Sequence, residues 1–221
     1  MKKNLQKIKK LKDKQEDIFA RTAQILGALS APVRLKLIHF ISQAPLSVEV
    51  LANKIDQSVA NTSMHLRKLL NESIVSVEVV GQKRLYSLHP AMFDFWEDIQ
   101  DFIQKLDPTL SIGGEVYGDM NWTLPIDNNK DIVFLDVRPD DEIKPHPMQT
   151  QKNYMHVSAN DLKDKLNLLP KKKKILVVCR GRMCALSAYA VDLLRQNSFN
   201  AYRLDKSWFV LNQTLKKKDN L

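Results

Sequence analysis

The sequence predicts two domains, a mainly α-helical one followed by an α/β domain with a mainly parallel sheet. Between residues 15 and 106 most apolar residues recur at helical spacing, whereas from residue 132 onward short aliphatic runs alternate with helical segments. Residues 107–130, DPTLSIGGEVYGDMNWTLPIDNNK, contain the glycines, prolines and Asn-Asn pair that are typical of a linker. We therefore predict domains over residues 1–106 and 130–221, joined by a linker over residues 107–129.

Composition limits the classes of function. The chain of 221 residues has 2 cysteines, too few for a disulfide framework, and shows no charged segment followed by the apolar segment of a signal peptide. Its apolar runs are too short to span a membrane, so we expect a cytoplasmic protein with no membrane contact. The net charge of +9 favours polyanionic partners, but the lysine runs are typical of solvated ends and loops. Charge alone therefore does not predict DNA binding.

Residues 46–71 have the pattern of a helix-turn-helix. One apolar stripe follows the capping residue Ser47, a turn covers residues 56–58, and a second stripe follows the N-cap candidate Ser58. The stripes comprise Val48, Leu51, Ala52 and Ile55, then Val59, Thr62, Leu66, Leu69 and Leu70. Two short helices joined by such a turn are what this motif requires.

The second helix of the motif is predicted to face DNA. Its outward face carries groups that reach base edges and phosphates: Asn61, Ser63, Met64, His65, Arg67 and Lys68. Alternating valines, a turn at Gly81 and a returning strand then predict a hairpin, or wing, with Lys83 and Arg84 near its tip. The alternative is a helix pair and hairpin that serve only for packing.

Two further apolar stripes lie at the ends of this half. They comprise Ile18, Ile25, Leu26 and Leu29, and then Met92, Phe95, Trp96, Ile99, Phe102, Ile103 and Leu106. Because these faces exceed what a small core needs, we expect the end helices to pair in a homodimer. Two-fold symmetry would then present two recognition helices to an inverted-repeat operator in double-stranded DNA.

The segments LSAPVRLKLIHFI, LANKIDQSVANTSMHLRKLL and VEVVGQKRLYSL resemble the winged-helix ArsR family of bacterial transcriptional repressors, over about residues 15–106. The resemblance implies a dimer formed by the terminal helices that releases DNA when an inducer binds. Many members sense metals through a Cys-x-Cys pair on the first helix of the motif. Ser47 and Glu49 stand at those positions here, so we expect no metal site there and an inducer that acts elsewhere.

The second half alternates strands and helices. Strands are predicted at the start of residues 132–142 and over residues 175–178 and 201–204, and helices over residues 160–169 and 185–196. This alternation indicates a parallel sheet, in which ligands bind at the carboxyl ends of the strands.

The loop CRGRMC, residues 179–184, lies at such a strand end. Backbone N–H groups, the following helix and the charges of Arg180 and Arg182 favour a thiolate at Cys179, while Gly181 permits a tight bend. We therefore predict that Cys179 is a nucleophile. The alternative is that both cysteines are small buried apolar residues, and Cys184 fits either interpretation.

Two other sites with cysteines are disfavoured. A metal site would need more ligands than two thiols at this spacing with no histidine near them in sequence, so we predict no metal and no cofactor. The phosphate-binding loop of a low-molecular-weight phosphatase or an arsenate reductase has the pattern Cys-x-x-x-x-x-Arg followed by Ser or Thr. Counted from Cys179, residue 185 falls within this pattern and is alanine, which disfavours such a loop.

The segments FLDVRPDDE, VVCRGRMC and AVDLLRQNSFNAYRLD resemble a rhodanese domain, over about residues 130–213. The resemblance implies that Cys179 carries sulfane sulfur as a persulfide. It also implies that the remaining loop residues hold the outer sulfur and that Asp136 and Arg138 brace the fold; the loop residues are Arg180, Gly181, Arg182, Met183 and Cys184. The glycine-rich segment expected after the first strand is missing, and of that motif His146 remains.

Together the halves suggest a DNA-binding transcriptional regulator, a repressor, that senses sulfane sulfur or redox state. The signal would be a persulfide on Cys179, or a bridge between Cys179 and Cys184, formed with a donor such as thiosulfate or polysulfide. One alternative is a sulfurtransferase whose DNA-binding domain recruits or autoregulates it. Another is a catalytically inactive domain used for protein contacts.

Overall fold

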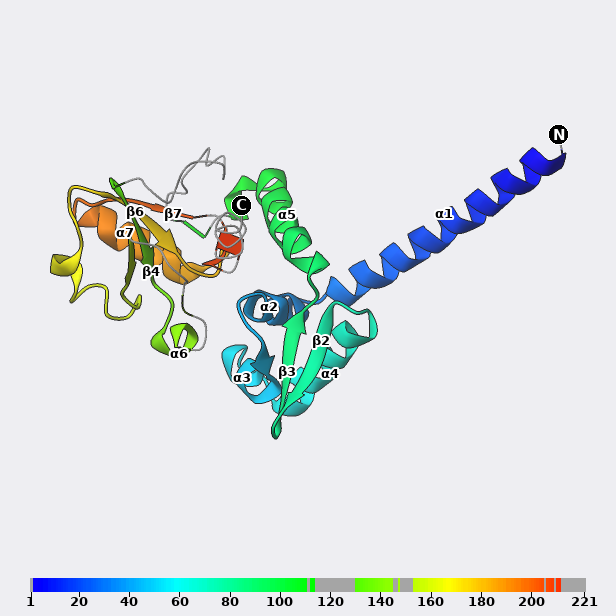
Figure 1. Cartoon of the computed structure of the whole chain (residues 1–221), viewed down its shortest axis with the longest axis horizontal. Coiled ribbons are helices and arrows are strands. Elements are labelled where there is room, and N and C mark those ends of the chain that lie inside the picture. Colours follow the sequence, from blue (N-terminus) through cyan, green and yellow to red (C-terminus); the bar gives the residue numbers. More distant parts are fainter. Residues whose placement is uncertain are drawn as a thin grey trace. The chain divides into compact units, whose positions relative to one another are not determined.

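A computed structural model (Figure 1) describes residues 2–110, 112–113, 130–144, 147, 153–204, 206–208 and 210–211. The chain divides into two compact units, Met1–Met92 and Phe93–Leu221. The two predicted kinds of domain are confirmed, whereas the predicted boundaries around residues 107–129 stay a prediction. Most of that linker, and His146, lie outside the described residues.

The first unit is a winged helix-turn-helix. Its elements are α1 (Lys2–Leu29), α2 (Pro32–Ile41), β1 (Leu46–Ser47), α3 (Val48–Lys54), α4 (Val59–Asn71), β2 (Val75–Val80) and β3 (Lys83–Leu88). The strands form an antiparallel sheet in the order β1-β3-β2. Both predicted caps form, because the hydroxyl of Ser47 accepts from the Val50 N–H and that of Ser58 accepts from the Asn61 N–H.

The helix-turn-helix is held by a small apolar core. Leu37 of α2, Leu51 of α3 and Leu66 and Leu69 of α4 are fully buried, so most of the predicted stripes face inward, whereas Val59 at the start of the second stripe is 46% exposed. Gly81, at φ +61, turns the chain between β2 and β3 at the predicted place, where a left-handed conformation favours glycine.

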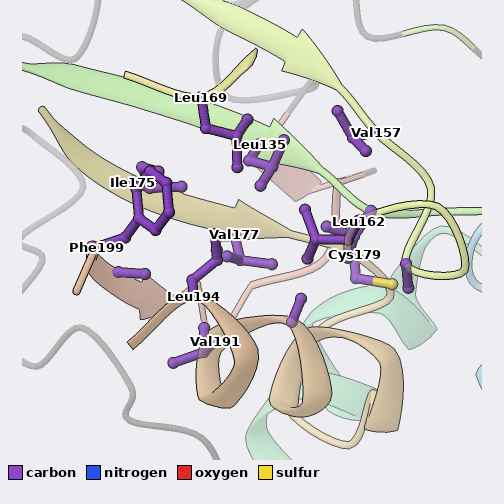
Figure 2. Packing of buried hydrophobic residues seen from close by; sticks show 14 of the residues in the cluster. Leu135, Val157, Leu162, Leu169, Ile175, Val177, Cys179, Val191, Leu194 and Phe199 are labelled. Atoms are coloured by element: carbon purple, nitrogen blue, oxygen red, sulfur yellow. The ribbon is translucent and has the colours of Figure 1, made fainter. Parts of the chain in front are cut away.

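The second unit is an α/β fold. Its elements are α5 (Ala91–Leu106), β4 (Ile132–Asp136), α6 (Asp140–Ile143), β5 (Tyr154–His156), β6 (Lys174–Val178), α7 (Ala185–Gln196) and β7 (Asn200–Arg203), with 3-10 helices at Pro108–Leu110 and Leu166–Leu168. Among the described residues the strands pair in the order β5-β4-β6-β7, all parallel. Alternate residues of β6 enter two separate apolar clusters, so both faces of the sheet are covered. Figure 2 shows the cluster in which α7 packs.

The helix predicted over residues 160–169 is wrong. This segment forms turns followed by the 3-10 helix Leu166–Leu168, with hydrogen bonds between residues three apart, as from the Asp164 N–H to the Asp161 carbonyl. Its Asn and Asp side chains compete for backbone hydrogen bonds, and Pro170 ends it. The short strands β1 and β5 were not predicted, because two or three residues carry no periodicity. In the described part of the chain, no helix is long and apolar enough to cross a membrane.

Candidate functional site

The cysteine loop, residues 179–184, lies at the carboxyl end of the central strand β6, and α7 begins at Ala185. The backbone fixes this loop at both ends. The carbonyl of Cys179 accepts from the Trp208 N–H at 2.9 Å, and the Cys184 N–H donates to the Gly181 carbonyl at 3.1 Å. Gly181 makes the bend at φ +94, a conformation that disfavours other residues.

The two sulfurs of the loop are in contact. The Sγ atoms of Cys179 and Cys184 lie 2.9 Å apart and share a hydrogen bond, and each residue is 1% exposed. Both belong to the apolar cluster of Figure 2, where Cys179 is drawn near Leu162. The site is therefore a buried thiol pair inside the loop. Its burial agrees with the interpretation of the cysteines as apolar residues, and the nucleophilic role of Cys179 stays a prediction.

The surroundings of this pair favour the thiolate at Cys184 rather than at Cys179. The hydrogen bond from Cys179 lowers the pKa of Cys184 to about 5, aided by the charge of Arg180 and by backbone hydrogen bonds at Arg180 and Ser187, while burial opposes this shift. Burial raises the pKa of Cys179 well above its usual range. Either thiol could donate the shared hydrogen bond, and these surroundings place the proton on Cys179. Cys184 also occupies the N-cap position of α7, where the helix N-terminus favours negative charge, although its side chain makes no capping hydrogen bond.

Both arginines of the loop have partners outside it. Arg180 donates to Glu142 of α6, with Nε 3.0 Å and Nη2 2.5 Å from its carboxylate oxygens. Arg182 donates to Gln104 Oε1 at 2.6 Å and pairs with Asp101 Oδ1 at 3.1 Å, both on α5. Met183 is half exposed. The loop thus reaches two acidic groups that the sequence analysis did not select.

Arg203 of β7 is a further missed residue. It is 2% exposed and donates to the carbonyls of Arg182 and Gly113 and, at 3.2 Å, to the hydroxyl of Ser187. It therefore fixes the loop backbone and the first turn of α7 together. The signal was an arginine within the short run AYRL, residues 201–204, that was predicted as a strand, because an ionised side chain in such a run requires partners.

Asp136 and Arg138 form a buried ion pair next to β4. Arg138 Nη2 lies 2.7 Å from Asp136 Oδ2, and both side chains are at most 1% exposed. The Tyr154 hydroxyl donates to the same carboxylate at 3.1 Å, and the guanidinium of Arg138 lies 3.9 Å from the ring centroid of Trp208. The negative charge of Asp136 is one of the smaller causes that raise the pKa of Cys179.

Replacing Gly181 with alanine is expected to destabilise the second unit by about 1–3 kcal/mol, because φ +94 is strained for any residue with a Cβ. The new Cβ would also meet the Ser207 backbone nitrogen at 3.4 Å. Urea unfolding measures the change. Gly27→Ala is the control, since Gly27 lies in α1 and a Cβ added there would have nothing within 4 Å. Equal stability of the two variants would contradict the strain.

The predicted DNA-facing residues lie on α4 and at the wing tip. Met64, Arg67 and Lys68 are exposed, and Asn61, Ser63 and His65 are half-buried. The Asn61 amide donates to Gln57 at 2.6 Å, and Lys68 lies 3.8 Å from Glu72. Lys83 and Arg84 are exposed at the start of β3. Across the described ranges, no three His, Cys, Asp or Glu side chains cluster as metal ligands.

Comparison with solved structures finds partial likenesses, among them the following three. Mb0332 from Mycobacterium bovis, a homodimeric winged helix-turn-helix DNA-binding domain, is 18% identical over 42% of this chain and 87% of its own, with a TM-score of 0.41. NolR from Sinorhizobium fredii is 26% identical over 42% and 91%, with a TM-score of 0.38. The transcriptional repressor BigR from Xylella fastidiosa is 23% identical over 43% and 95%, with a TM-score of 0.36.

Comparison with curated proteins finds no match. Comparison with protein families finds two, in separate parts of the chain. The family described as helix-turn-helix domain matches residues 29–78, and the family described as rhodanese-like domain matches residues 121–213. The chain is therefore a helix-turn-helix domain fused to a rhodanese-like domain.

Proposed function

We propose that the chain is a DNA-binding transcriptional repressor of the ArsR type that senses sulfane sulfur through Cys179 and Cys184. The observation that carries this proposal is the contact of the two buried sulfurs, which lie 2.9 Å apart. A thiolate beside a thiol is the arrangement from which a persulfide can be formed and then resolved to a bridge.

The proposed chemistry needs a hydropolysulfide as oxidant. The Cys179 sulfur attacks the outer sulfur of the donor, the donor S–S bond breaks, and HS⁻ leaves while the Cys179 proton passes to Cys184. Cys184 then attacks the inner sulfur of the Cys179 persulfide, its proton passes to the outer sulfur, and that sulfur leaves as a second HS⁻. In sum, Cys179–SH, Cys184–S⁻ and HSS⁻ give the disulfide and two HS⁻, so the cysteines lose two electrons and the sulfane sulfur gains them.

The DNA-binding part of the proposal rests on α4, the wing and exposed apolar side chains. Ile18, Phe19 and Leu26 of α1 and Phe102 and Leu106 of α5 are exposed in the single chain, which favours a homodimer formed through these helices. Such a dimer would present two copies of α4 to an inverted-repeat operator.

The experiment combines intact mass with operator binding. The reduced protein is treated with hydropolysulfide, the mass and the modified peptide are determined, and operator affinity is measured by mobility shift before and after. We expect one persulfide on Cys179 or a bridge to Cys184, together with a changed affinity. Unchanged affinity of a fully modified protein would refute the sensor proposal.

Replacing Arg67 and Lys68 with alanine is expected to weaken operator binding by at least about tenfold at moderate salt, because each lost phosphate contact removes counterion release. Each should also reduce the slope of log affinity against log salt by about 0.9. Fluorescence anisotropy measures both. Replacing Lys163 and Lys165 together with alanine removes the same two positive charges from exposed positions of the second unit and is the control. Parallel losses in the control would mean that net charge, not α4, determines affinity.

The second candidate function is a sulfurtransferase, which the lowered pKa of Cys184 favours because a thiolate is the reacting form. Burial of both sulfurs favours a single event over rapid turnover. Measuring thiocyanate released from thiosulfate and cyanide distinguishes the enzyme from the sensor. Many turnovers per chain indicate an enzyme, whereas uptake of one equivalent of sulfur per chain indicates a sensor. Failure to take up labelled sulfane sulfur at all would indicate a domain used for protein contacts.

A further inference from the structure

Helix α5 presents a polar face to the cysteine loop and the segment after β7, which belong to the same unit. Glu97, Asp101 and Gln104 recur at i, i+4 and i+7, so they lie on one side of the helix. Arg182 of the cysteine loop contacts Asp101 and Gln104. Beyond the loop, Glu97 accepts from the Ser207 N–H at 3.2 Å and lies 2.9 Å from the ammonium of Lys206. This face of α5 is therefore joined by charged and polar contacts to the rhodanese-like unit.

The opposite face of α5 is apolar. At 3.6 residues per turn, Phe95, Ile99, Phe102 and Leu106 lie across the helix from Asp101, and Phe102 and Leu106 are 56% and 70% exposed. This is the face that the proposed function assigns to the dimer. Along the chain, His89 and Pro90 alone separate α5 from β3, a strand of the wing. Helix α5 thus contacts the cysteine loop and carries the proposed dimer face. Through His89 and Pro90 it is also linked covalently to the DNA-binding unit.

Arg182 lies within the loop segment that a bridge between the cysteines would close into a ring. Forming the bridge shortens the sulfur–sulfur distance from 2.9 Å to about 2.05 Å and removes the negative charge of Cys184. The loop backbone at Arg182 is also held by Arg203, which donates to the Arg182 carbonyl. Movement of this short ring and loss of its charge therefore act directly on the position of Arg182.

We propose that Arg182 transmits the state of the cysteine pair to α5 through Asp101 and Gln104, making Asp101 a positioning residue for regulation. This inference rests on the proposed function. In the dithiol state, Arg182 is held on the polar face of α5. In the bridged state the contact of Arg182 with Asp101 and Gln104 is rearranged. The position of α5 then changes, and with it the dimer face on α5 and the wing strand β3 that precedes it in the chain. The position of α5 thus depends on whether the cysteine pair is reduced or bridged.

The test compares operator affinity in the dithiol and bridged states of the full chain, with the state verified by mass. For the wild type we expect the two affinities to differ by about tenfold or more, a usual size for allosteric coupling. For Asp101→Asn we expect the ratio to approach one. Asp98→Asn makes the same charge change at an exposed position on the same helix and should keep the wild-type ratio. Asp101→Glu, which restores the carboxylate, should recover most of it.

A second readout separates coupling from a structural defect. Because coupling is reciprocal, operator DNA should shift the dithiol–disulfide potential of the wild type by about 30 mV for each tenfold in affinity, and should not shift that of Asp101→Asn. A wild-type ratio retained in a folded Asp101→Asn protein would overturn the inference and leave the proposed function intact. If the wild type binds the operator with the same affinity in the dithiol and bridged states, both the inference and the proposed function are overturned.

Discussion

In the variant Cys184→Ser, the remaining thiol is expected to react at pH 7 about a hundredfold more slowly than in Cys179→Ser. The thiolate is the reactive form, and burial raises the pKa of Cys179, so little of it is ionised at neutral pH. In Cys179→Ser a hydroxyl replaces the thiol that donates to Cys184, and Arg180 and the helix N-terminus still stabilise the charge there. Alkylation by iodoacetamide, followed by mass, measures both rates.

The same two variants are matched controls, because both sulfurs lie in one closed loop and each variant retains one of them. Differences in access therefore affect the comparison little, and the order of the rates reports ionisation. Equal rates, or faster reaction of Cys179 alone, would contradict the assignment of the charge to Cys184.

The pH dependence of the wild type follows from the same assignment. The lowered pKa of Cys184 means that the thiolate is complete above about pH 6 and is lost as the pH falls through about 5. The alkylation rate should therefore be flat between pH 6 and 8 and decrease below pH 5. A cysteine of ordinary pKa would instead react about tenfold faster for each unit of pH over the neutral range. A rate that rises in this way would show that the pair does not hold a thiolate.

Replacing Asp136 with alanine is expected to destabilise the second unit by about 3–5 kcal/mol. The change leaves the guanidinium of Arg138 buried without the carboxylate that neutralises it, and an uncompensated buried charge is costly. The Tyr154 hydroxyl also loses its acceptor. Urea unfolding followed by tryptophan fluorescence measures the loss, since Arg138 packs on the ring of Trp208.

Two controls identify the cause of that loss. Asp161→Ala removes an exposed carboxylate that pairs with Lys165 at 3.0 Å, and we expect little change because exposed ion pairs contribute little. Combining Asp136→Leu with Arg138→Met removes both charges, so it should cost less than Asp136→Ala alone. If the double variant were the less stable, the loss would come from packing and not from the unpaired charge.

Local patterns were sufficient for much of the fold. The capping serines Ser47 and Ser58, the apolar stripes of α3 and α4 and the turn at Gly81 act between residues close in sequence, so spacing alone located the helix-turn-helix and the wing. The helix predicted over residues 160–169 is wrong because local spacing there does not decide the structure. Apolar residues there follow helical spacing, but polar side chains and Pro170 favour turns, and tertiary packing of Leu162 and Leu169 is satisfied without a helix.

The sequence by itself determined that a cysteine loop lies between a strand and a helix, because apolar runs and periodicity are local properties. Only the tertiary structure decided which of the two thiols is favoured as the thiolate and which groups Arg180 and Arg182 contact. Arg180 meets Glu142 and Arg182 meets Asp101, groups distant along the chain that folding brings within hydrogen-bonding distance. The pKa of a buried thiol depends on burial and on such neighbours, so no local pattern contains it.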